Sequence, residues 1–344
     1  MHCDWPDLAG FEPSVCLQQA LARNLAFKRG QRLGLGLSGG ADSAMLAVHA
    51  HLWAISRGIE LHFFHVHHGL QAMADQWQET VHELARRLHR PCHSLRAQVR
   101  PEKLSADGME SAARDARYQA LAQMADFVGV QDILLAHHQD DQAETVLLRL
   151  LRGAGPTGLG AMAPSLARDG LTYWRPWLEQ PRVTILGDSE RFTAATGWAA
   201  VQDPTNAHPD YTRGALRELL TPALNARWPG WQSVLQRQAR LSRETRDVLE
   251  SVARQDLQAL ELGDDGRSFS LAAWRRLEPA RQSLAIRHWL QGQGAGMPTE
   301  ARLAELMRQL RGLHALGHDR QLQLKHGPWL IRCVRGRVIL DTDR

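Results

Sequence analysis

A short apolar segment that enters a cluster of glycines and continues as a helical pattern constrains this fold most. Residues 33–50 read LGLGLSGGADSAMLAVHA. The apolar run over 32–37 ends in glycine-rich sequence, and an amphipathic segment follows over 42–58. A strand that feeds a helix through a tight turn is typical of a parallel sheet with helices on its faces.

The same alternation of strand and helix patterns continues through the first half of the chain. Right-handed crossovers between parallel strands place the helices on both faces of the sheet, which predicts an α/β, Rossmann-like fold. Ligands of such sheets bind at the carboxyl ends of the strands. Further strands are expected at 59–70, 92–99 and 132–138, and helices at 73–90, 109–129 and 141–153.

The alternation ends after Pro222. Residues 231–262 read as one long, arginine-rich amphipathic helix, and 268–340 continues helical before it closes with alternating residues typical of a small antiparallel sheet. We therefore expect three parts, with a mainly helical domain last. They are a helical lead-in over 1–30, an α/β domain over 31–215, and a helical substrate domain over 216–344 that ends in a small β element.

Composition excludes several classes of protein. The chain is 44% hydrophobic and 23% charged, which is ordinary for a soluble protein. No apolar stretch approaches the roughly 18–20 residues that span a bilayer, and the N-terminus lacks a secretory pattern, so a cytoplasmic protein is expected. The four cysteines form no CxxC pair, which argues against a zinc site or a disulfide framework.

The net charge is +4, and the basic residues are almost all arginine, since the only lysines are Lys28, Lys103 and Lys325. Arginine suits bidentate contacts with phosphate, which favours an anionic partner, although genome base composition is an equal explanation.

The glycine cluster permits several interpretations. Gly34, Gly36 and Gly39 fit a dinucleotide fingerprint, but the next strand ends in HVHHGL and lacks the acidic residue that binds ribose. A Walker loop needs Gly-Lys-Ser/Thr, where this chain has Gly40-Ala41. An ordinary glycine turn also stays open. The favoured interpretation is a phosphate-binding turn, SGGADS, over 38–43.

In this turn Gly39 and Gly40 let backbone N–H groups approach a phosphate, and the following helix contributes its positive N-terminus. Bare phosphate would repel Asp42, so this residue makes sense chiefly as a magnesium ligand beside the phosphate. The turn resembles the pyrophosphate (PP) loop of N-type ATP pyrophosphatases, which adenylate their substrates. The predicted ATP-binding residues are Ser38, Gly39, Gly40, Ala41, Asp42 and Ser43.

A second group of polar residues, AHHQDDQAET, follows the strand at 132–135. Asp141 and Glu144 are three residues apart on the predicted helix and project into the same space, with His138 at the mouth. They could hold magnesium, take a proton from an amine, or position a cationic substrate. An acidic helix start can also simply complement the helix dipole. The helical spacing predicts a buried face of Ala143, Val146, Leu147 and Leu150.

The two motifs together resemble tRNA(Ile)-lysidine synthetases, and the similarity extends over roughly residues 30–225. The family pattern has Asn where this chain has His67, and Asn where it has Gly214. The latter substitution leaves the role of that position open. Other matching segments are ESAARDARYQAL (110–121), RGAGPTGLGAM (152–162), RPWLEQPR (175–182) and DPTNAHPDYTRGALRELLTPAL (203–224).

The resemblance implies an ATP-dependent ligase that attaches free L-lysine to C2 of the wobble cytidine of a CAU-anticodon tRNA(Ile), which changes decoding from AUG to AUA. It implies an adenylated cytidine intermediate, with ATP and Mg²⁺ as cofactors. Asp42 would be the metal ligand, and Arg114 would contact the polyphosphate or the developing negative charge. Asp141 and Glu144 would assist the metal or orient and deprotonate lysine. A homodimer is one option for the oligomeric state.

Arginines of the second half are candidates for a tRNA-facing surface, foremost Arg213, Arg217, Arg240 and Arg276. For each of them a solvated helix face balanced by local acids is the alternative. Trp228, Trp231, Trp274 and Trp289 could stack on unpaired bases, but core packing is the favoured role.

Two other functions stay open. Another PP-loop enzyme is possible, although a thiolase of this kind relies on cysteines that carry sulfur or bind a cluster, and no CxxC is present. A non-catalytic nucleotide-binding or RNA-binding module would bind ATP without turnover. It would have no need of Asp42, Asp141 and Glu144 together.

Overall fold

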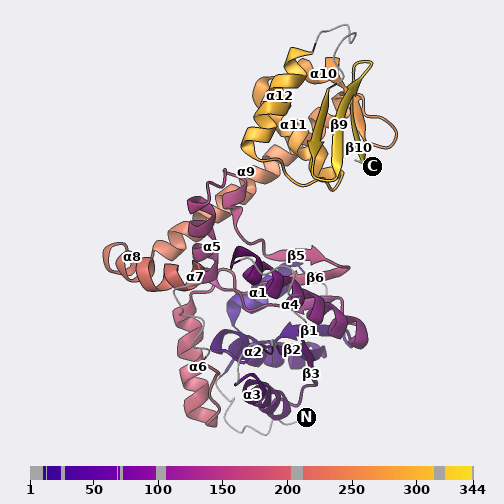
Figure 1. Ribbon diagram of the computed structural model, residues 1–344. Helices are drawn as coiled ribbons and strands as arrows, with labels where there is room; N and C mark the ends of the chain where they lie inside the picture. Colours follow the sequence, from indigo (N-terminus) through magenta and orange to yellow (C-terminus); the bar gives the residue numbers. More distant parts are fainter. Residues whose placement is uncertain are drawn as a thin grey trace. The chain divides into compact units, whose positions relative to one another are not determined.

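The computed structural model divides into two compact units, Met1–Arg240 and Leu241–Arg344, which we describe separately (Figure 1). No helix in the described part of the chain is long and apolar enough to span a membrane. Likewise, no disulfide joins Cys16, Cys92 and Cys333, the cysteines that the structure describes. The described residues are 11–12, 14–24, 28–67, 69, 73–97, 106–202, 212–313 and 322–342.

The first unit contains a six-stranded sheet in the order β3-β2-β1-β4-β6-β5. Strands β3, β2, β1, β4 and β6 are mutually parallel, and β5 pairs antiparallel at the edge. The predicted α/β parallel-sheet fold is therefore confirmed. The strands are β1 (Arg32–Gly36), β2 (Glu60–His67), β3 (Cys92–Arg96), β4 (Asp132–Leu134), β5 (Ser165–Arg168) and β6 (Leu171–Trp174).

The predicted helices of the first half are also present, and α6 adds to them. Hydrophobic residues of α1, α2, α3 and α6 form one cluster with the leucines of β1, while α4 forms a second cluster with Phe64, Ile133 and Tyr173. Two separate clusters on one sheet show that both faces are covered. These helices are α1 (Val15–Asn24), α2 (Ala41–Arg57), α3 (Ala74–Arg87), α4 (Ala106–Val128), α5 (Gln139–Leu151) and α6 (Arg182–Thr196).

Gly34 and Gly36 belong to strand β1 and not to the phosphate-binding turn. A Cβ atom on Gly34 would lie 2.6 Å from the Phe64 ring, and one on Gly36 would lie 3.2 Å from the Leu135 side chain. These two glycines therefore make room for side chains that pack on the α4 face. The dinucleotide-fingerprint interpretation needs them in the turn, so the structure removes its basis.

The rest of the first unit consists of short helices and the start of α9 (Trp231–Ala259). The sequence patterns did not resolve the short helices or the β5–β6 hairpin. The predicted long helix over 231–262 is confirmed by α9. The short elements are η2 (Gly158–Gly160), α7 (Thr212–Ala215), η4 (Leu216–Leu220), which is a π-helix, and α8 (Thr221–Arg227).

The second unit has its own core, in which helices pack on a four-stranded antiparallel sheet ordered β7-β10-β9-β8. Trp274 and Trp289 are buried in this core and Trp231 is buried in the first unit, as expected, whereas Trp228 is 58% exposed. The elements are β7 (Ser268–Ser270), α10 (Leu271–Arg275), α11 (Pro279–Gly292), α12 (Glu300–Gly312), β8 (Gln323–His326), β9 (Trp329–Val334) and β10 (Arg337–Thr342).

Candidate active site

The turn that follows β1 is closed by hydrogen bonds from its own serines. The Ser43 hydroxyl donates to the carbonyl oxygen of Gly40 at 3.1 Å and accepts the backbone N–H of Ser38 at 3.1 Å. The two hydroxyl oxygens of Ser38 and Ser43 lie 3.0 Å apart. Gly39 has φ +94°, a conformation that residues with a Cβ rarely adopt. The turn is thus pre-shaped, and its backbone requires glycine at position 39.

Helix α2 starts within this turn, at Ala41, and no side chain of the described residues caps it at Gly40. The first N–H groups of a helix have no partner within the helix, and they favour an anion. An uncapped helix start beside two glycines can therefore accept phosphate oxygens. Ala41 contributes only its backbone there.

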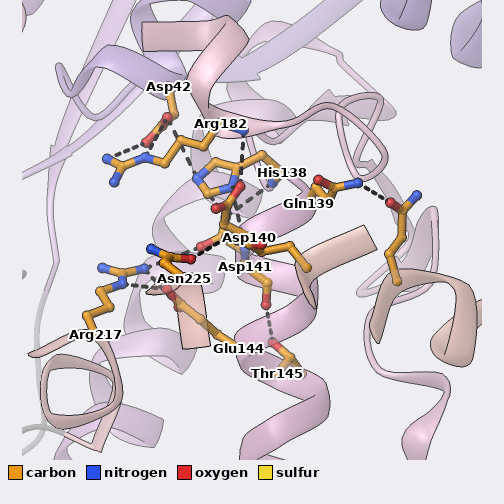
Figure 2. Close-up of polar contacts among 12 residues, drawn as sticks. Asp42, His138, Gln139, Asp140, Asp141, Glu144, Thr145, Arg182, Arg217 and Asn225 are labelled. Atoms are coloured by element: carbon orange, nitrogen blue, oxygen red, sulfur yellow. Dashed lines mark hydrogen bonds and ion pairs between the residues drawn. The ribbon is translucent and has the colours of Figure 1, made fainter. Parts of the chain in front are cut away.

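Asp42 lies in the first turn of α2 and contacts a guanidinium and an imidazole from distant segments (Figure 2). Its Oδ1 is 3.3 Å from Nε of Arg182, and its Oδ2 is 3.4 Å from Nη2 of the same residue. Nε2 of His138 is 3.7 Å from Oδ1. Burial raises the pKa of Asp42, but His138 and Arg182 outweigh this effect and hold the pKa below its usual value. Asp42 is therefore a carboxylate at neutral pH.

His138 is the N-cap of α5 and lies between Asp42 and the carboxylate of Asp141. Its Nδ1 accepts the backbone N–H of Asp141 at 3.4 Å, and the Asp141 carboxylate accepts the backbone N–H of His138 at 3.2 Å, which completes a capping box. Its Nε2 faces both Asp42 and Asp141, the latter at 3.4 Å. Burial lowers the pKa of His138, but Asp42, Asp141 and Asp140 outweigh burial and raise it.

Arg217 connects Glu144 and Asp141. Its Nε and Nη2 donate to the two carboxylate oxygens of Glu144 at 2.6 and 2.9 Å, and Nη2 is 3.5 Å from Oδ1 of Asp141 (Figure 2). Arg217 lies in the π-helix η4, a type of distortion that is frequent at functional sites. Contacts therefore run continuously from Asp42 through His138 and Asp141 to Glu144.

Two of the three acidic residues of α5 are buried, whereas on the predicted core face Leu147 is only half-buried and Leu150 is exposed. Asp141 and Glu144 are 9% and 5% exposed, while Leu150, expected on the buried face, is 53% exposed. That part of the helical-face prediction is wrong. Asp141 and Glu144 can be buried on this helix because His138 donates a hydrogen bond to Asp141 and Arg217 donates two to Glu144.

Arg114 lies on α4, where its guanidinium is over the Tyr118 ring and donates to the Tyr118 hydroxyl at 3.4 Å. Burial lowers the pKa of His137 well below its usual value, and the nearby arginines 175, 117, 114 and 213 lower it further. Nδ1 of His137 and Nε of Arg175 are buried and have no hydrogen-bond partner among the residues that the structure describes. Arg114 and Arg213 thus belong to a cationic region around the end of β4.

The four arginines proposed for tRNA binding are not equivalent. Arg217 is tied to Glu144, and Arg213 donates to the Thr145 hydroxyl at 3.4 Å, so both belong to the α5 site. Arg240 is exposed in the first unit and Arg276 is exposed in the second.

Sequence reasoning overlooked Arg182. It lies in the RPWLEQPR segment, which was noted as a motif without a role for its last residue. The described residues contain no cluster of three or more His, Cys, Asp or Glu side chains that could hold a metal by itself. A magnesium ion here would need phosphate oxygens beside Asp42, which is how Mg²⁺ is usually bound at nucleotide sites.

Comparisons with known proteins agree with this geometry. Residues 13–224 match the family model described as a PP-loop domain, and residues 269–339 match the TilS substrate binding domain. The tRNA(Ile)-lysidine synthase of Bordetella bronchiseptica is 57% identical, over 90% of this chain and 89% of its own length. That of Polaromonas naphthalenivorans is 38% identical, over 86% and 85% of the two chains.

A solved structure, the U34-tRNA thiolase NcsA from Methanococcus maripaludis, shares the fold with a TM-score of 0.54. It covers 66% of this chain and 77% of its own, at 16% identity. At 16% identity, this similarity supports only a shared fold.

Proposed function

The chain belongs to the tRNA(Ile)-lysidine synthase family, and we propose that it uses ATP to join free L-lysine to C2 of the wobble cytidine of a CAU-anticodon tRNA(Ile). The observation that carries the proposal is the contact between the two predicted motifs. A phosphate-binding turn, through Asp42 and His138, meets the buried carboxylates of α5. This arrangement is suited to an adenylating enzyme with a cationic second substrate.

The reaction consists of two displacements. The C2 oxygen of cytidine attacks the α-phosphorus of ATP, the bond to the β-phosphate breaks, and pyrophosphate leaves with the electron pair. The ε-amino group of lysine then attacks C2, a proton is lost, and AMP leaves with the former C2 oxygen. An amine is a nucleophile only when deprotonated, which is the reason to assign a base to this site.

We assign phosphate binding to the SGGADS turn at 38–43 and a magnesium contact to Asp42. One or two carboxylates plus phosphate oxygens form the usual magnesium environment, so the oxygen atoms of Asp42 fit the ion. The ion would supply neutralisation of phosphate charge. Arg114 supports the developing negative charge from the cationic region around His137.

Asp141 and Glu144 are proposed to orient the lysine ammonium and to take its proton. The contact of Arg217 with both carboxylates supports this role, since a cationic nitrogen already occupies the space between them. The lysine amine would use the same oxygens after Arg217 moves.

We propose that four arginines contact tRNA phosphates: Arg213, Arg217, Arg240 and Arg276. We also propose three functional parts of the chain, the lead-in 1–30, the ATP-binding domain 31–215 and the tRNA-binding domain 216–344. The reaction is placed in the cytoplasm, where the tRNA and lysine are found. A homodimer is compatible with these assignments.

Transfer of labelled lysine to an isoleucine tRNA transcript tests the function directly. With ATP and magnesium the protein should label the CAU transcript, and a transcript with uridine at the wobble position should accept none. Pyrophosphate release without lysine transfer would instead indicate another PP-loop enzyme. Nucleotide binding without release of pyrophosphate would indicate a non-catalytic module.

A further inference from the structure

The backbone of Arg182 is held by a hydrogen bond, whereas its guanidinium group is partly exposed and free to change rotamer. It is the first residue of α6, and its backbone N–H donates to Oδ2 of Asp140 at 3.0 Å. Its side chain is 43% exposed and reaches Asp42 with two nitrogens, at 3.3 and 3.4 Å. A guanidinium at the end of an anchored backbone can change partner without moving the helix.

Both oxygens of Asp42 contact Arg182, so a cation bound to the same carboxylate would compete with the guanidinium. Like charges a few ångströms apart repel, and a divalent cation would repel the guanidinium more strongly than a monovalent one. Nucleotide phosphates in the adjacent turn would at the same time bring several negative charges. Arginine binds phosphate with a planar pair of donors, so these oxygens are its natural new partner.

The order of contacts indicates which phosphates are concerned. Arg182 contacts Asp42, His138 stands between Asp42 and Asp141, and Arg217 follows on the Asp141 and Glu144 side (Figure 2). If lysine and the tRNA base react beside Asp141 and Glu144, the α-phosphate faces that side. The pyrophosphate part of ATP then lies toward Arg182, at the opposite end of the series of contacts.

We propose that Arg182 exchanges Asp42 for the β- and γ-phosphates when ATP binds with its cation, and that it stabilises the pyrophosphate that leaves. This inference rests on the proposed function. In the adenylation step the β-phosphate oxygen receives the electron pair of the broken bond and gains one negative charge. Arg182 compensates this charge and frees Asp42 in the same exchange.

Ligand binding in the absence of tRNA tests the proposal without turnover. Affinities for α,β-methylene-ATP with magnesium, for pyrophosphate with magnesium, and for AMP are measured by calorimetry. Arg182→Ala should weaken the first two ligands about 10- to 100-fold, as expected for lost charge-assisted hydrogen bonds, and change AMP affinity less than about twofold. Arg182→Lys keeps the charge without the fork and should recover part of the affinity.

Arg191→Ala is the matched control, because Arg191 is on the same helix and pairs with an aspartate, Asp188. It should bind all three ligands like the wild type. Wild-type affinity of Arg182→Ala for the methylene analogue, or tighter binding, would overturn the proposal, as would an equal loss of AMP binding. A wild-type protein that binds none of the three ligands would contradict the proposed function itself.

Discussion

The two glycines of the phosphate-binding turn should respond very differently to the same added methyl group. Gly39 has φ +94°, and a Cβ there would lie 3.1 Å from both Val201 and Val81. The backbone conformation costs about 1–2 kcal/mol for a residue with a Cβ, and overpacking adds about 1–3 kcal/mol. Gly39→Ala is therefore expected to lower the free energy of unfolding by about 2–5 kcal/mol.

Gly40 is the control in the adjacent position. Its φ is −68°, and within the described part of the chain a Cβ would meet nothing closer than the Ser38 hydroxyl at 3.8 Å. Gly40→Ala should change the free energy of unfolding by less than about 1 kcal/mol, the scale of a changed N-cap. The added methyl group would crowd a phosphate held by the backbone N–H groups of the turn, so ATP affinity should fall about tenfold.

Urea unfolding of both variants, followed by circular dichroism, together with ATP titrations, measures the two effects. Equal stability of Gly39→Ala and the wild type would refute the strained-turn argument. A loss of stability in Gly40→Ala as large as in Gly39→Ala would refute the assignment of separate roles.

Two further predictions concern α5. Glu144→Gln keeps the size of the side chain but turns one of the two oxygens that accept from Arg217 into an amide N–H donor. Lysine transfer to tRNA should fall at least about 100-fold, and the unfolding temperature should also fall because a buried ion pair loses its charged partner; wild-type transfer would exclude Glu144 as a base. The raised pKa of His138 implies stability that is full below pH 6.5 and is lost as pH rises through the folded value. His138→Asn keeps a good N-cap and should abolish this loss in nucleotide-free, magnesium-free protein; identical pH profiles of variant and wild type would contradict it.

Local sequence patterns predicted the parallel sheet because long apolar runs and helical periodicity are strong signals. The β5–β6 hairpin was missed since strands of four residues, such as Ser165–Arg168, carry too little pattern. Helical periodicity also placed Leu150 in the core, where the structure exposes it. Periodicity gives the spacing of a face but not the direction in which tertiary contacts turn it.

The candidate site shows the same limit. Asp42, Asp141 and Glu144 could be named from motifs, and so could the position of His138. The pairing of Arg182 with Asp42 joins residues 140 positions apart, and that of Arg217 with Glu144 joins residues 73 apart. No local pattern encodes such contacts, so Arg182 received no role and Arg217 was assigned only to tRNA.

The central claim is that Asp42 serves the attack on the α-phosphate of ATP, and pyrophosphate release tests it most directly. The assay contains ATP, magnesium and the CAU transcript but no lysine, so only adenylation is measured. Asp42→Asn should reduce release at least about 100-fold while tRNA affinity stays within about twofold, and the exposed control Asp247→Asn should release pyrophosphate normally. Wild-type release by Asp42→Asn would contradict the account.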